Sequence, residues 1–427
     1  MTVPVHNLYD FVHQVTKNKY LLLYFYPWGH KSLTDVHHYQ LDQSCLDGAR
    51  GISVENRFVP FDIPVHNPWV HVQAFQPVIL CHDQEPLHFD LYNSNSDFVK
   101  HMTVVNKNQF DIELSPQTLS QNLRLSLLKS VQKTWILLHS ELNSPELSRY
   151  ESTGRFQGAY WWSHAVIARD WYRYAQHDRA LQPGHLRKLF LCYSRDTAGS
   201  RSYRKDFQEQ LRKSQLDNQC QFQSFDGNPV GADASAIYNA KDFNHTAISV
   251  VLETVFDQRI HLTEKVLRAI ACGHPFILAA GPGSLQLLRS YGFHTFHDYI
   301  NEDYDTITDP ALRLQAIVKE MNRIATLPQT KQTELVEILR NIAAYNQQRF
   351  FSDEFFQQVV DQLARNVDAA FAQHQGHLDF SLWWQQRRWR KQQLGTSWKQ
   401  VINHRQAIDL VLTYRQQRLN QRVSHEQ

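Results

Sequence analysis

The chain has 427 residues and a net charge of +2, and 42% of its residues are hydrophobic, with aromatic residues at 12%. This composition can bury proper cores, which excludes a disordered chain, and the length allows two domains and an appendage. Its five cysteines form no close pair, which argues against a disulfide framework or a zinc site. No apolar run approaches about 18 residues, and the start lacks the plan of a signal peptide, so we expect a soluble, cytoplasmic protein.

Strands alternate with helical segments in the first part of the chain. The expected strands are residues 21–26, 77–81, 104–105, 135–139 and 160–163, and leucine spacing predicts a helix at 119–131. Two of these strands run into polar stretches, HDQEP at 82–86 and SELNSP at 140–145. Polar loops at the ends of alternating strands predict a Rossmann-like domain over residues 1–180.

A second Rossmann-like domain is expected over residues 181–350, after a hinge at 181–184. Its expected strands are 189–193, 222–225, 247–252 and 276–280, and its expected helices are 203–214, 266–271, 312–324 and 335–345. The remaining residues, 351–427, should form a helix at 355–371 and a C-terminal tail. The expected fold class is therefore α/β, with two facing Rossmann-like domains and a C-terminal helical tail.

The second domain contains a strand–helix–strand unit that carries the strongest local signals. Glu253 ends the first strand, Thr263 suits a helix N-cap, and Lys265 stands in the first turn of the helix. A cation there opposes the helix dipole, so it fits best if an anion binds at the helix N-terminus. Gly281 and Gly283 follow the second strand, where they either let backbone N–H groups approach a phosphate or form only a tight turn.

The same unit resembles the signature of the α-1,3-fucosyltransferase family (glycosyltransferase family 10). That signature is a Phe-Glu-Asn-Ser strand end, a short gap, Tyr-Ile-Thr-Glu-Lys, a helix and a Val-Pro-Val-Val strand. This chain has LET at 252–254, HLTEK at 261–265 and HPFI at 274–277. It departs from the pattern after the first glutamate, where Thr254 and Val255 replace Asn-Ser.

Three upstream segments resemble the family in the same order. Residues 193–203 are similar to its strand, Ser-Asn loop, arginine and tyrosine, and residues 160–173 resemble its Tyr-Arg-x-Asp-Ser-Asp stretch. Residues 135–145 match its Glu-Ser-Pro strand end loosely, and residues 1–130 show no match. The resemblance covers residues 135–300 and indicates a distant relative, so fucose as the sugar does not follow.

The resemblance implies a GT-B enzyme that transfers a sugar from a nucleotide-sugar donor to an acceptor hydroxyl with inversion, without a cofactor or a divalent metal. The leaving diphosphate needs fixed cations beside it, and carboxylates would accept hydrogen bonds from ribose or sugar hydroxyls. The expected donor-binding residues are Arg195, Arg201, Tyr203, Glu253, Thr263, Glu264, Lys265, Gly281 and Gly283.

Inversion also needs a general base on the acceptor side. Glu141 and Glu85 both end strands of the first domain. The position of Glu141 in the family pattern favours Glu141 as the base, and the dense polar cluster at residues 82–85 favours Glu85. The expected acceptor-side residues are His82, Asp83, His164 and Arg169. These residues also have a purely structural interpretation, as a cap, an internal ion pair or a satisfied hydrogen-bonding group.

The tail from residue 381 has nine basic and two acidic residues, a net charge of +7 that leaves −5 for the rest, and four tryptophans among them. It either packs on the body or contacts an anionic surface or nucleic acid. The acceptor is therefore open between glycan, lipid and nucleic acid. Two other functions stay open: a non-catalytic nucleic-acid-binding protein on the same scaffold, and a GT-B enzyme of other chemistry, such as an epimerase or a phosphorylase.

Overall fold

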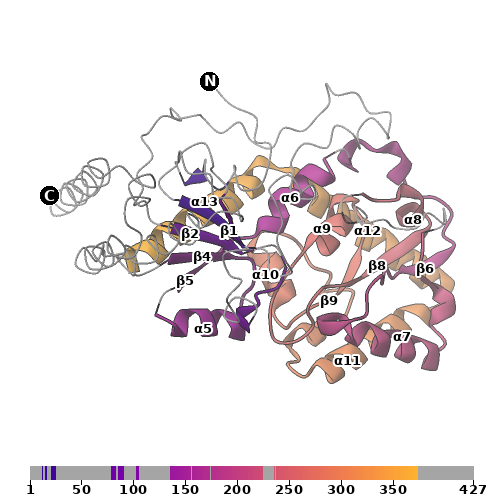
Figure 1. The fold of residues 1–427 in the computed structure, drawn as a ribbon. Helices are drawn as coiled ribbons and strands as arrows, with labels where there is room; N and C mark the ends of the chain where they lie inside the picture. The colour runs from indigo at the N-terminus through magenta and orange to yellow at the C-terminus, as the bar shows by residue number, and fades with distance from the viewer. Residues whose placement is uncertain are drawn as a thin grey trace, which may run out of the picture.

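The computed structural model describes residues 12, 15–16, 21–25, 78–82, 85–90, 102–104, 135–154, 156–173, 175–224, 235 and 237–373 (Figure 1). The predicted helix at 119–131, the expected acceptor residue Asp83 and the basic tail lie outside these residues. Within them the fold is α/β, with sheets built mainly from parallel strands and a helical C-terminal region.

The first sheet has the strand order β3-β1-β2-β4-β5. Its strands are β1 (Leu21–Phe25), β2 (Val78–His82), β3 (Met102–Val104), β4 (Trp135–His139) and β5 (Phe156–Tyr160). All neighbours are parallel except β3, which pairs antiparallel with β1 at the edge. The side chains of β4 are all buried, as expected for a central parallel strand covered on both faces.

The strand predicted at 160–163 is wrong, because β5 ends at Tyr160 and a helix begins at Ser163. Trp161 and Trp162 are buried by tertiary contacts, and the indole nitrogen of Trp162 donates to the carbonyl of Leu262 at 2.9 Å. An aromatic run buried in a loop therefore gave the pattern of a strand.

The second sheet is parallel throughout and has the order β7-β6-β8-β9. Its strands are β6 (Lys188–Leu191), β7 (Cys220–Gln221), β8 (Thr246–Leu252) and β9 (Phe276–Ala279). The strand predicted at 222–225 is wrong in position, since the ladder joins Cys220 and Gln221 to β6. Every side chain of β8 is buried, which places this β-branched run at the centre of the sheet.

The helices are α5 (Pro145–Ser152), α6 (Ser163–Trp171), α7 (Tyr203–Lys213), α8 (Ala240–Asn244), α9 (Glu264–Ala271), α10 (Ser284–Ser290), α11 (Pro310–Ala325), α12 (Gln329–Phe351) and α13 (Asp353–Gln373). Short 3₁₀ turns include η8 (Gly199–Arg201) and η11 (Asp303–Thr306). None of the described helices combines the length and apolar character needed to cross a bilayer.

The last of the described helices returns to the first sheet. In Figure 1, α13 (yellow) runs back beside β4 and β5, and it contacts both strands and α6. Arg169 of α6 fixes this return, because its buried guanidinium donates to the carbonyls of Phe350 and Ser352 and pairs with Asp353 at 3.3 Å. The described apolar core consequently runs without a break from the first sheet to the second.

Candidate functional site

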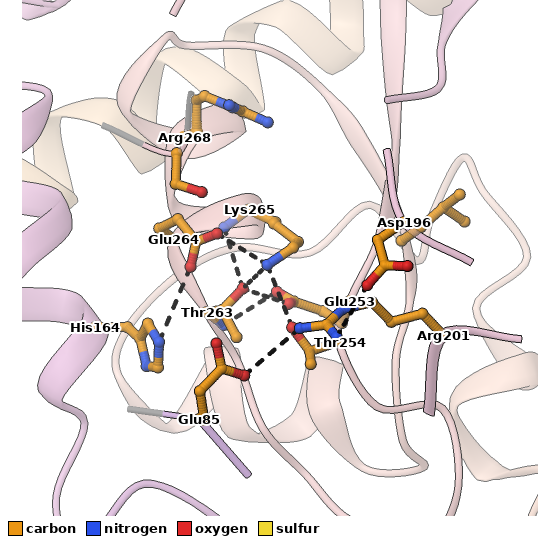
Figure 2. A network of polar contacts seen from close by, with 12 residues as sticks. Glu85, His164, Asp196, Arg201, Glu253, Thr254, Thr263, Glu264, Lys265 and Arg268 are labelled. Atoms are coloured by element: carbon orange, nitrogen blue, oxygen red, sulfur yellow. Dashed lines mark hydrogen bonds and ion pairs between the residues drawn. The ribbon is translucent and has the colours of Figure 1, made fainter. Parts of the chain in front are cut away.

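A largely buried network of polar side chains surrounds the N-terminus of α9 (Figure 2). Thr263 is the N-cap, and its hydroxyl accepts from the backbone N–H of Lys265 at 3.3 Å. The carboxyl of Glu253, at the end of β8, accepts from the backbone N–H of Thr263 at 3.1 Å and from its hydroxyl at 2.5 Å. Burial raises the pKa of Glu253, against the opposing effects of Lys265 and Thr263. Both oxygens of Glu253 thus hold the loop that starts the helix.

Lys265 is held by three acceptors. Its Nζ donates to Glu264 at 2.8 Å and to the hydroxyls of Thr263 and Thr254 at 3.2 and 3.3 Å, and its side chain keeps 25% of its exposure. Burial alone would raise the pKa of Glu264, but the charge and hydrogen bond of Lys265, together with His164 and a backbone N–H, hold that pKa well below its usual range. The network therefore contains an ionised carboxylate and a partly exposed ammonium that it keeps in place.

A second cation belongs to the loop after β6. Arg201, at the end of η8, pairs with Asp196 at 3.3 Å and with Glu85 at 3.5 Å. Glu85 lies just after β2 of the first sheet, so this contact joins the two sheets. Figure 2 shows Glu85 and Arg201 pointing toward one another close to the network of α9. Arg195, on the same loop as Arg201, is exposed.

The loops that follow the carboxyl ends of the two sheets also meet through backbone and buried polar contacts. Leu142 and Ile260 form an antiparallel bridge with N···O distances of 2.9 and 3.0 Å. His261 faces Ser140, with its Nδ1 3.3 Å from the carbonyl oxygen. The ends of β4 and β8 are thereby fixed against each other beside α9.

His164, expected on the acceptor side, lies against the α9 network. Its Nε2 is 3.9 Å from Glu264, and its ring packs edge to face on His261 with centroids 5.2 Å apart. Burial lowers the pKa of His164 to about 4, so its imidazole is neutral at pH 7. His82 is buried at the end of β2, edge-on to Tyr150, while Arg169 holds the junction of α12 and α13, away from this network.

Glu141 and Glu85 differ in accessibility. Glu141 is only 1% exposed; its Oε1 accepts from the backbone N–H of Leu87 at 2.9 Å and lies 3.5 Å from Arg259. Burial raises the pKa of Glu141, against the opposing charge of Arg259. The side chain of Glu85 retains 40% of its exposure. Of the two, Glu85 is the carboxylate that a bound molecule can reach. Glu141 instead anchors the backbone at Leu87, two residues after Glu85.

Gly281 and Gly283 have structural reasons of their own. A Cβ on Gly281 would lie 1.8 Å from the carbonyl oxygen of Arg259. Gly283 has φ +83, and its N–H donates to the carbonyl of Asp305 at 2.8 Å. The carboxylate of Asp305 accepts from the next helical N–H groups, at 3.1 and 3.3 Å. The protein therefore caps α10 with its own carboxylate at the turn for which either phosphate binding or a purely structural role was expected.

Two buried side chains support the end of β8 from α7. The Tyr203 hydroxyl donates to the carbonyl of Glu253 at 2.7 Å, and its ring stacks on Phe256. Arg204 donates to the carbonyls of Leu252 and Glu253 at 2.7 and 3.0 Å. Tyr203 was expected to bind the donor, whereas Arg204 and Arg259 were not among the residues predicted from the sequence. The sequence offered one signal for each arginine: Arg204 directly follows Tyr203, and Arg259 lies in the gap between the segments 252–254 and 261–265.

The described residues contain no group of three side chains suited to hold a metal ion. A hollow of about 250 Å³ between α7 and α11 is lined by none of the residues discussed above. Comparison of the chain with protein-family models, with curated proteins and with solved structures gave no match.

Proposed function

We propose that this protein is an inverting glycosyltransferase of the GT-B type, which moves a sugar from a nucleotide-sugar donor to an acceptor hydroxyl. The observation that carries the proposal is the pair of partly exposed cations, Lys265 and Arg201, beside the carboxyl ends of the second sheet's strands, with Glu85 of the first sheet against Arg201. Open α/β sheets bind ligands at this edge. Two facing Rossmann-like domains would place donor and acceptor on opposite sides of it.

In the proposed reaction the acceptor oxygen attacks the anomeric carbon from the side opposite the diphosphate. The new C–O bond forms as the bond to the diphosphate breaks, and the leaving group keeps the electron pair. Lys265 and Arg201 would neutralise the charge that develops there, which is why the proposal needs no divalent metal. Glu85 would accept the hydroxyl proton, because it is the reachable carboxylate of the first sheet.

Titration calorimetry with a panel of nucleoside diphosphates tests the donor site. Lys265→Ala should weaken binding about 10- to 100-fold, since a lost charged hydrogen bond contributes about 1.5–3 kcal/mol. Lys331→Ala is the matched control, because Lys331 is an exposed lysine paired with Glu334 on α12. The proposal fails if the wild-type protein binds no nucleoside diphosphate, or if both lysine variants bind equally well.

A transfer assay with nucleotide sugars tests the base. Glu85→Gln should abolish sugar transfer while the protein still binds the diphosphate, because only removal of the acceptor proton is affected. Glu141→Gln should instead lower both stability and transfer, because the buried carboxylate holds Leu87 and Arg259. If Glu85→Gln transfers sugar at the full rate and Glu141→Gln is stable but inactive, Glu141 is the general base instead.

A further inference from the structure

We infer that Glu85 and the donor diphosphate compete for Arg201, so that donor binding releases Glu85 to act on the acceptor. This inference rests on the proposed function and extends it to the order of events at the site. The guanidinium of Arg201 uses one terminal nitrogen for Asp196 and the other for Glu85. A diphosphate that binds the same two nitrogens brings negative charge against both carboxylates and competes with them for the guanidinium.

The relative strengths of the contacts favour the diphosphate. The two ion pairs of Arg201 measure 3.3 and 3.5 Å, longer than the roughly 2.7–2.9 Å of a strong charged hydrogen bond. Both carboxylates keep substantial exposure, 51% for Asp196 and 40% for Glu85, and pairs of this kind contribute little in water. Arginine binds phosphate oxygens with two parallel hydrogen bonds, which adds energy as well as fixed geometry.

Within the first sheet, only the side chain of Glu85 needs to move in this exchange. The backbone that follows it is fixed, because Leu87 donates to Glu141 at 2.9 Å and Phe89 donates to Glu146 at 2.8 Å. The carboxylate would therefore stay at the edge of the first sheet when Arg201 leaves it.

The consequence is an order of binding. While Glu85 pairs with Arg201, one of its two carboxylate oxygens is engaged, and an acceptor hydroxyl that approaches that oxygen competes with a cation. Once a diphosphate holds Arg201, the same carboxylate is available to accept the hydroxyl proton. The donor should therefore bind first, and the acceptor should bind productively to the complex.

A double-mutant cycle on nucleoside diphosphate affinity tests the competition directly. Removing the charge of Glu85 frees Arg201 in advance, so Glu85→Gln should tighten diphosphate binding about 3- to 5-fold, the upper range of a weak ion pair. Arg201→Gln should weaken binding about tenfold or more. In the Arg201→Gln background, adding Glu85→Gln should change affinity by less than about twofold, because the shared partner is gone.

Glu146→Gln is the control for a general field effect. Glu146 lies on α5, where it pairs with Arg149 and not with Arg201, and a glutamine oxygen at this position can still accept from the N–H of Phe89. A loss of negative charge that acts only through space would tighten binding in Glu146→Gln as well, and in both Arg201 backgrounds. Melting temperatures of all variants show whether each protein is folded before it is titrated.

The outcomes separate the inference from the proposed function. Diphosphate binding by the wild-type protein, with unchanged or weaker binding by Glu85→Gln, overturns the competition and leaves the donor site intact. Equal tightening by Glu85→Gln with and without Arg201 also overturns it. A wild-type protein that binds no nucleoside diphosphate overturns the proposed function, and the inference falls with it.

Discussion

Replacement of Gly281 by alanine distinguishes a structural glycine from one that admits a phosphate. The added Cβ would lie 1.8 Å from the carbonyl oxygen of Arg259 and 2.7 Å from its carbonyl carbon. Real Cβ atoms essentially never approach closer than 3.0 Å, so the backbone at Arg259 would have to move by more than about 1 Å. That backbone is bridged at Ile260 to Leu142, so the shift would reach the contact between the sheets.

Overpacking of a well-packed site costs about 1–3 kcal/mol, and the opposing atoms here are backbone, which yields less than the end of a side chain. We therefore expect Gly281→Ala to lose about 3 kcal/mol of stability. For a unit of about 150–250 residues, this corresponds to a fall in melting temperature of roughly 6–12 °C. Thermal unfolding followed by circular dichroism measures it, and nucleoside diphosphate titration is run on the same samples below the transition.

Gly283→Ala is the matched control from the same loop. Its φ of +83 makes alanine strained by about 1–2 kcal/mol, but its Cβ would meet only Ile260 Cδ1, at 3.4 Å. Gly281→Ala should therefore be the less stable of the two. If Gly281→Ala melts like the wild type and loses only diphosphate affinity, the structural reasoning is wrong and the glycine serves the ligand.

Three further predictions concern pH, a buried arginine and the tail. Burial lowers the pKa of His274 to about 4 from 6.5, so stability should fall as pH drops from 6.5 to 4, by up to about 3 kcal/mol. In His274→Gln, the slope of the unfolding free energy against pH, measured with denaturant across that window, should fall by the equivalent of about one proton. An unchanged slope would contradict this. Arg313→Met should cost about 3 kcal/mol or more, since Arg313 donates to the carbonyls of Ile307, Thr308 and Asp257; a wild-type melting temperature would contradict it. Truncation after Gln373 should leave donor hydrolysis intact and weaken binding to polyanions most at low salt, whereas an aggregated product would favour a tail that packs on the body.

Elements with complete local signals could be predicted from the sequence. The strand β4 matches the predicted residues 135–139, because an uninterrupted apolar run is required where both faces of a sheet are covered. The start of α9 was predicted from Thr263, whose side chain does form the N-cap. Glu253, Glu264 and Lys265 were expected together near this cap, and the structure brings them together in one network.

Features that depend on distant partners could not be predicted. Glu141 and Glu85 look alike in sequence, but Glu141 is buried beside Arg259, 118 residues further along the chain, whereas Glu85 stays partly exposed. The cap of α10 comes from Asp305, which no local motif connects to Gly283. The assignments of donor residues, acceptor residues and domain boundaries at 180 and 350 remain predictions, although α13 is seen to contact the first sheet.

Lys265 and Arg201 differ in how firmly the protein holds them, and this difference favours different roles for them in the proposed reaction. The ammonium of Lys265 has three acceptors, one of them an ionised carboxylate at 2.8 Å, so its position is set before any ligand arrives. Charges fixed in this way stabilise a transition state without reorganisation during the reaction. Arg201 has two longer pairs with exposed carboxylates, so any reorganisation on binding falls on it. In the proposed reaction, the fixed cation would stabilise the developing charge, and the exchangeable one would couple donor binding to the base.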